Sequence, residues 1–186
     1  MCTLKIEKKR IEEIIQSTIR TVGIDIELKQ QITGVNMSYN FILNYIGYDD
    51  IRIEEAIKEM QDPVSLESYI HAFTLHELGH ALDREALLDS LTKTLEYYEM
   101  KKNSTKYERY SNPNLLAMLI EEHEMNIVFE ETAWVNAEKL NREYGLVDWA
   151  SFEKLKNQGM ATYLKLYAKD LKLYNKLVSQ QTEQIA

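Results

Sequence analysis

The chain has 186 residues, of which 30 are acidic and 22 are basic, and it therefore carries a formal net charge of -8. This length is enough for one domain with a sizeable hydrophobic core. The acidic balance argues against a general affinity for nucleic acid or for anionic membranes. The single cysteine, Cys2, cannot form an internal disulfide, and the sequence contains neither an apolar signal segment nor a membrane-spanning run. We therefore expect a soluble cytoplasmic protein.

The pattern of breaks and apolar residues predicts a mainly α-helical fold. Six glycines and two prolines favour long helices over many short strands. Apolar residues at three- and four-residue spacing predict an amphipathic helix over residues 4–21 that ends before Gly23. Between Gly23 and Gly47, alternating and β-branched residues predict two or three short strands. The expected fold class is α+β, with a small sheet in a single domain over residues 1–186.

The rest of the chain is expected to be helical, with one loop. The pair Asp62-Pro63 predicts the N-cap and the first residue of the helix that carries the motif described next. Residues 101–112 have no apolar period, which predicts a loop. The other expected elements are a short helix over 51–60, a long helix from Pro113 to about Glu143 that ends at Gly145, and a helical region from Asp148 with a break at Gly159.

The segment His76-Glu77-Leu78-Gly79-His80 has the pattern HExxH. Residues four apart lie on one face of a helix, so His76 and His80 can place two imidazole nitrogens on one metal ion at about 2.0–2.1 Å. Glu77 is rotated by about 100° from His76, which places it near a water bound to the same ion. Residues 73–82 carry no other charge, as expected for a helix inside the protein. The pattern predicts a zinc site with a general base.

Two further residues of this helix have structural interpretations. Gly79 costs about 1 kcal/mol relative to alanine within a helix. Close approach of a neighbouring element would explain it, and simple tolerance is the alternative. His71 falls on the packing side of the helix and is expected to be a structural histidine.

A catalytic zinc ion usually takes three protein ligands and keeps one position for water. The segment Glu130–Ala137 offers a carboxylate, Glu130, followed three residues later by a small residue. Together with HELGH this segment resembles the gluzincin zinc metallopeptidases, and in size and layout the chain is similar to the ImmA/IrrE-like peptidases of mobile elements. The resemblance implies a minimal zincin-like domain with Zn2+ as cofactor and a protein or peptide as substrate. Trp134 stands where relatives often have a polar residue that supports a ligand histidine.

Helix geometry also distinguishes Glu130 from its neighbour Glu131. The two residues are about 100° apart, so only one can face the metal. Glu130 shares its direction with an apolar face that includes Leu116, whereas Glu131 shares its direction with Glu124 at a boundary with solvent. We therefore expect the metal ligands to be His76, His80 and Glu130.

The expected chemistry is hydrolysis by a metal-activated water. Glu77 would take the proton of the water and pass it to the leaving amine. An additional donor should stabilise the oxyanion, which contributes about 3–4 kcal/mol in other hydrolases. Asp83 faces the ligands and is expected either to support a ligand histidine or to be a solvated acid. The candidate oxyanion donors are His123, which lies two turns before Glu130 on the same face, Tyr107 and Tyr110.

Two other functions are compatible with the same residues. One is a regulatory or toxin–antitoxin interaction protein that keeps a metal site for stability, and the other is a zinc hydrolase of non-peptide amides. Glu77 favours catalysis, because a structural zinc ion has no use for a base and usually has four protein ligands. The sequence leaves the substrate and the oligomeric state open.

Overall fold

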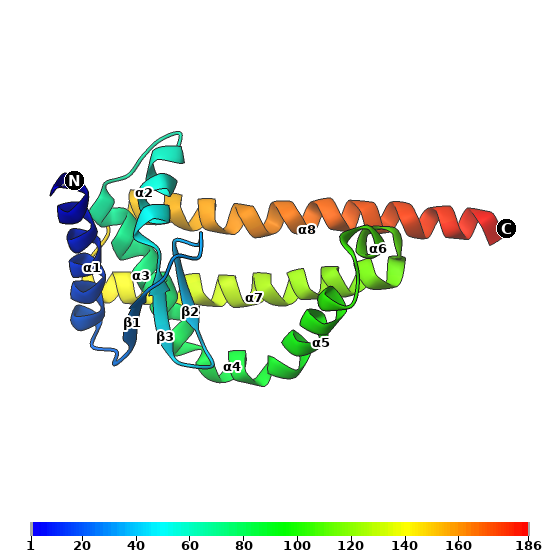
Figure 1. Ribbon diagram of the computed structural model, residues 1–186, viewed down its shortest axis with the longest axis horizontal. Helices are drawn as coiled ribbons and strands as arrows, with labels where there is room; N and C mark the ends of the chain where they lie inside the picture. Colours follow the sequence, from blue (N-terminus) through cyan, green and yellow to red (C-terminus); the bar gives the residue numbers. More distant parts are fainter. Residues whose placement is uncertain (1, 186) are drawn as a thin grey trace. The chain divides into compact units, whose positions relative to one another are not determined.

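The computed structural model describes the backbone of residues 2–185 and the side chains of residues 9–180. The side chain of Cys2 lies outside these described residues. Mainly helical structure with one small sheet confirms the predicted α+β class (Figure 1). No helix in the described part of the chain is long and apolar enough to cross a bilayer. The helices are α1 (Cys2–Val22), α2 (Asp50–Glu59), α3 (Leu66–Leu82), α4 (Arg84–Asp89), α5 (Leu91–Lys102), α6 (Lys106–Ser111), α7 (Pro113–Tyr144) and α8 (Trp149–Ile185).

The chain divides into two compact units, each built from two segments. The first unit comprises residues 1–84 and 132–157, and the second comprises residues 85–131 and 158–186. Residues 113–131 of α7 and 158–185 of α8 belong to the second unit, and the other residues of these two helices belong to the first unit. The expectation of a single domain stays a prediction.

The first unit contains a three-stranded sheet with the order β1-β3-β2. The strands are β1 (Glu27–Gln30), β2 (Met37–Asn40) and β3 (Tyr45–Tyr48). The central strand β3 is buried along its whole length, runs parallel to β1 and is antiparallel to β2. The edge strand β2 packs against α3 (Figure 1). The predicted region of short strands is therefore confirmed, and it lies beside the helix that carries the HExxH pattern.

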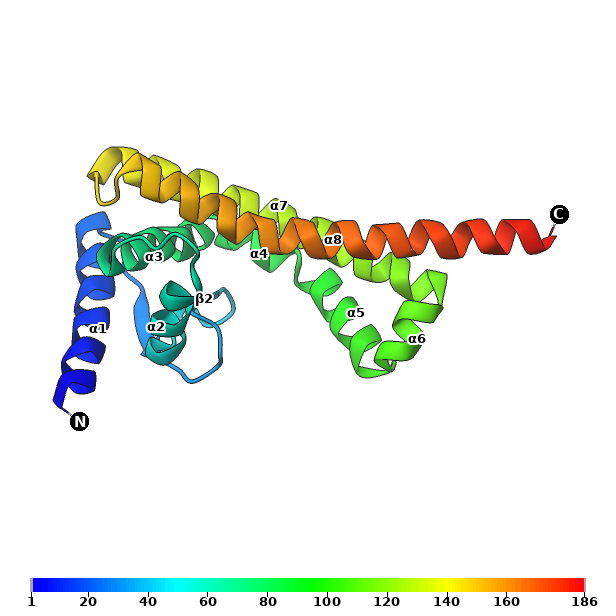
Figure 2. The same ribbon diagram turned by 90° about the horizontal axis from the view of Figure 1, so that it is seen from above.

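Helix α1 packs its apolar face against α3 in the first unit (Figure 2). Ile11 and Ile15 are fully buried on this face. The helix ends at Gly23 with a φ of +76°, a conformation that favours glycine. The Thr18 hydroxyl lies 2.7 Å from Nδ1 of His71, so the structural interpretation of this histidine is confirmed.

His71 is expected to make the stability of the protein depend on pH. Burial lowers the pKa of His71 below its ordinary value of 6.5, so below that pH the unfolded chain binds more protons than the folded chain. The stabilisation is complete above about pH 6.5 and is lost as the pH falls through the lower folded value. Urea unfolding with a chelator present should show a smaller acid loss for His71→Asn than for wild type between about pH 7.5 and pH 5. Parallel losses would contradict this expectation.

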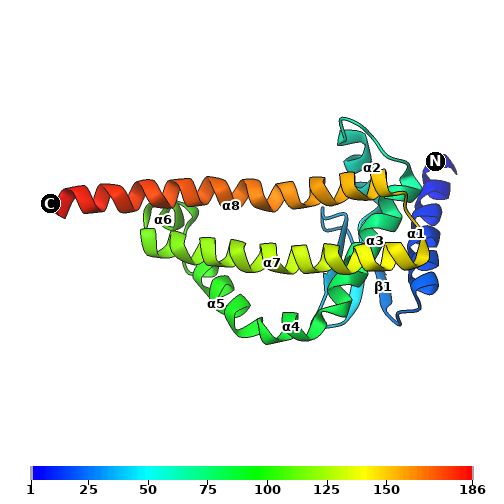
Figure 3. The ribbon, with the colours of Figure 1, turned by 180° about the vertical axis from the view of Figure 1, so that it is seen from behind.

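The second unit has its own apolar core. Met100 of α5 and Leu116, Leu119 and Ile120 of α7 form its buried centre. Side chains of α8 such as Tyr174 cover this centre, and α5 and α6 lie next to the first half of α7 (Figure 3). The apolar residues that recur at helical spacing in this part of α8 thus pack against the core of this unit.

The start of the motif helix differs from the prediction. α3 begins at Leu66, and its N-cap is Ser65, whose hydroxyl accepts a hydrogen bond of 3.0 Å from the backbone N–H of Ser68. The side chain of Asp62 instead forms an ion pair with Lys154. The prediction of a cap at Asp62-Pro63 is therefore wrong, because another capping residue lies three positions further along the chain.

Two other predicted features are also wrong. Residues 101–112 are not a loop: α5 continues to Lys102, and α6 follows because Thr105 and Glu108 form a capping box. Helix α8 also continues through Gly159 without a break. A single glycine costs about 1 kcal/mol in a helix, which packing on both sides of it can offset. The predicted helices over 51–60 and from Pro113 to Gly145 are confirmed.

Candidate metal centre

Three potential metal ligands come together as the helix geometry predicts. Their ligand atoms, from His76, His80 and Glu130, all lie within 4.8 Å of one another. Two imidazoles and one carboxylate are a donor set typical of catalytic zinc. Glu131 is exposed and does not belong to this group. The three residues His76, His80 and Glu130 therefore have the chemistry and spacing to hold a zinc ion.

A close crossing of α3 and α7 brings the ligands together. A Cβ atom added to Gly79 would lie 3.0 Å from the carbonyl carbon of Ala133 and closer still to its oxygen. Asn136, one turn later, donates a hydrogen bond of 3.2 Å to the carbonyl oxygen of Gly79. Glu130 precedes Ala133 by one turn of the same helix, so this crossing fixes the position from which its side chain extends. Gly79 is therefore required by close approach, as one of the two readings of the sequence predicts.

Gly79→Ala should destabilise the protein, although alanine is the better helix former by about 1 kcal/mol. The new methyl group would collide with the backbone of Ala133, which cannot move without separating the two helices. Overpacking of this kind costs about 1–3 kcal/mol. Urea unfolding in the presence of a chelator measures this effect independently of metal binding. A variant that is more stable than wild type would refute the close-packing explanation.

An aromatic side chain supports the first ligand histidine. The indole of Trp134 stacks on the ring of His76 with centroids 4.4 Å apart and an angle of 28°. Trp134 is 1% exposed and is held edge-on by Phe73 and Phe152, both at 5.8 Å. Its Nε1 finds no hydrogen-bond partner among the described residues. Stacking therefore restricts the orientation of the His76 ring.

Trp134→Phe should weaken zinc binding about tenfold, because residues that orient a ligand histidine typically contribute 10–100-fold to affinity. The smaller ring of phenylalanine would leave part of the His76 face without contact. Trp149 provides a matched control, since it is 44% exposed and its ring lies against Phe152. Competition with a chelator should show normal affinity for Trp149→Phe. Equal affinities for both variants would contradict the orienting role of Trp134.

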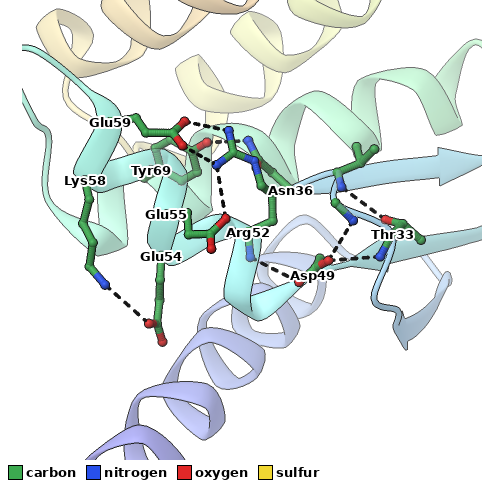
Figure 4. Close-up of polar contacts among 11 residues, drawn as sticks. Thr33, Asn36, Asp49, Arg52, Glu54, Glu55, Lys58, Glu59 and Tyr69 are labelled. Carbon is green, nitrogen blue, oxygen red and sulfur yellow. Dashed lines mark hydrogen bonds and ion pairs between the residues drawn. The ribbon is translucent and has the colours of Figure 1, made fainter.

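The aromatic contacts continue from Trp134 through Phe73 to Tyr69, whose ring lies 4.6 Å from that of Phe73. Asn36 donates a hydrogen bond of 2.7 Å to the Tyr69 hydroxyl (Figure 4). Burial raises the pKa of Tyr69 to about 12, so the hydroxyl stays protonated at neutral pH. Phe73 and Trp134 are thus connected to the segment between β1 and β2.

Asp49 holds this segment in place. Its carboxylate accepts hydrogen bonds of 3.0 Å from the backbone N–H groups of Thr33 and Gly34 and one of 3.2 Å from that of Arg52 (Figure 4). Burial alone would raise the pKa of Asp49, but these backbone donors outweigh it and lower the pKa. The carboxylate therefore remains charged and holds Thr33 and Gly34 beside the N-terminus of α2.

Two acidic residues lie close in sequence to the ligand histidines, Glu77 within α3 and Asp83 at its C-terminal end. Glu77 is 5% exposed and directly follows the ligand His76. Asp83 is the C-cap of the helix, where its backbone N–H donates to the carbonyl oxygen of His80 over 3.0 Å. This position is adjacent to the last turn that carries the ligands. A role of the Asp83 carboxylate in supporting a histidine stays a prediction.

Asp170 is a buried partner of His123 and Tyr110 that the sequence does not predict. This carboxylate is fully buried in the second unit and lies 3.0 Å from Nε2 of His123. It also accepts a hydrogen bond of 3.2 Å from the hydroxyl of Tyr110, and burial and this carboxylate raise the pKa of Tyr110. Tyr107 is 82% exposed. These contacts are those of a structural histidine beside a buried carboxylate, and the role of His123 as an oxyanion donor stays a prediction.

No protein-family model, curated protein or solved structure matches this chain. The functional assignment therefore rests on the chemistry of His76, Glu77, His80 and Glu130.

Proposed function

We propose that this chain is a zinc-dependent peptidase of the gluzincin type, with a minimal zincin-like domain. The observation that carries the proposal is the convergence of His76, His80 and Glu130 within 4.8 Å, with Glu77 next to the first ligand. The donor set leaves one of four tetrahedral positions for water. Glu77, a buried glutamate that directly follows the first ligand, has the chemistry of a general base for this water.

The residues divide the reaction between them. When bound, zinc supplies a Lewis acid that polarises the scissile carbonyl and lowers the pKa of a bound water towards about 7. Glu77 accepts the proton of that water and passes it to the nitrogen of the leaving amine. Trp134 keeps the His76 ring in one orientation through the stacked contact at 4.4 Å. Because Nε2 of His123 lies 3.0 Å from Asp170, this histidine would have only Nδ1 left to donate to an oxyanion.

The edge strand β2 supports a peptide as the substrate. It pairs with β3 on one side only, and its other side has no strand partner among the described residues. An extended peptide can add to such an edge through main-chain hydrogen bonds. Because β2 packs against α3, a peptide bound there would run beside the helix that carries His76 and His80.

A proteome-wide search for cleavage products in the source cell tests the proposal. Cells that express wild type are compared with cells that express Glu77→Gln at the same level. New N-termini that occur only with wild type would support a peptidase. Identical sets of termini, with zinc present in both proteins, would favour the interaction protein that uses its metal for stability.

A further inference from the structure

The middle of α8, over residues 165–176, carries a face whose only charged residues are lysines. Between Glu153 and Glu183 the only acidic residue is Asp170, which is fully buried. Over the same stretch four exposed lysines follow one another at spacings of four, three and four residues. They form no ion pair among the described residues, whereas other lysines of this unit do, as in Lys93–Glu96 at 2.9 Å. The four residues of this lysine face are Lys165, Lys169, Lys172 and Lys176.

This lysine face opposes the stability of the helix on which it lies. At 100° per residue the four lysines fall within about 60° of one another, opposite the apolar residues that cover the core. Like charges three and four residues apart repel each other on a helix surface. The helix dipole does not compensate, because its effect is confined to the last turn and Lys176 precedes Ile185 by nine residues (185 minus 176). A face that served only solubility would be more stable with alternating charges.

The length and chemistry of the face indicate its partner. Eleven residues separate the first and last lysine (176 minus 165), which corresponds to about 17 Å along the helix. An extended peptide of about five residues covers this distance. The face lacks the arginines and aromatic side chains that favour nucleic acid. Membrane binding requires a free apolar face, but Tyr174 and Leu177 of α8 pack against the core.

We infer that the lysine face of α8 binds an acidic segment of a partner protein. This inference does not depend on the proposed peptidase activity. If the protein is a peptidase, the lysine face recruits a partner protein, or regulates the activity, through a site other than the metal centre.

A binding assay on the full chain, without zinc and without turnover, tests the inference. The probe is a fluorescein-labelled peptide with about five adjacent glutamates, and a peptide with glutamine in their place is the control. Fluorescence anisotropy should show that changing all four lysines of the face to glutamine weakens binding at least about tenfold. Binding to wild type should also weaken as salt rises. The control is a variant with Lys9, Lys58, Lys102 and Lys106 changed to glutamine. It has the same net charge as the lysine-face variant and should bind the peptide like wild type.

Several results would overturn the inference. One is equal binding by the two glutamine variants, and another is no preference for the acidic peptide over its glutamine control. Tighter binding of duplex DNA or of phosphatidylserine vesicles that depends on the same lysines would assign the face to that polyanion instead. The lysine-face variant should also be at least as stable as wild type, because repulsion between like charges is removed. A lower melting temperature would show that these lysines serve the fold.

Discussion

Glu77→Gln is expected to lower kcat/KM for peptide hydrolysis by about 10²–10⁴-fold, the usual contribution of a general base. Glutamine has nearly the same shape as glutamate, so the buried position of residue 77 can accept it. Its amide cannot accept a proton from water. Because His76, His80 and Glu130 remain in place, the variant should retain wild-type affinity for zinc.

The measurement compares turnover of a substrate found in the cellular search with the zinc content of each purified protein. Glu131→Gln is a matched control, since it makes the same chemical change at an exposed residue outside the ligand group. It should hydrolyse the substrate at the wild-type rate. Wild-type turnover by Glu77→Gln would show that another group is the base.

Much of the metal centre could be predicted because its residues follow local rules. The pair His76 and His80 depends only on the period of a helix, and the same period separates Glu130 from Glu131. Both helices lie where the sequence signals predict them, although α3 begins later than expected.

Contacts between segments distant in sequence could not be predicted in the same way. Nothing in the local sequence indicates that Trp134 stacks on His76 or that Asp170 accepts hydrogen bonds from His123 and Tyr110. These contacts depend on how helices pack, which the chain pattern does not specify. Helix α6 is a different case, because the Thr-x-x-Glu pattern at Thr105 is a local signal for a helix start even though the segment has no apolar period.

Glu130→Ala is expected to weaken zinc binding by more than about 100-fold. Changes to residues that only orient a ligand cost 10–100-fold, and Glu130 is placed to supply one of the three ligand atoms itself. The two histidines would remain, so weak binding by a two-ligand site should persist. The crossing at Gly79 does not involve the Glu130 side chain, and the fold of the apo protein should therefore be unaffected.

The comparison with Glu131→Ala makes this prediction specific. Both variants lose one carboxylate from the same turn of α7 and acquire the same net charge, so a general electrostatic effect on zinc would be equal in the two. Glu131 is exposed, and its variant should bind zinc like wild type in competition with a chelator. If Glu131→Ala loses zinc and Glu130→Ala keeps it, the third ligand is Glu131 and the assignment of Glu130 is wrong. If both keep it, the carboxylate ligand of the proposed gluzincin site does not come from this turn of α7.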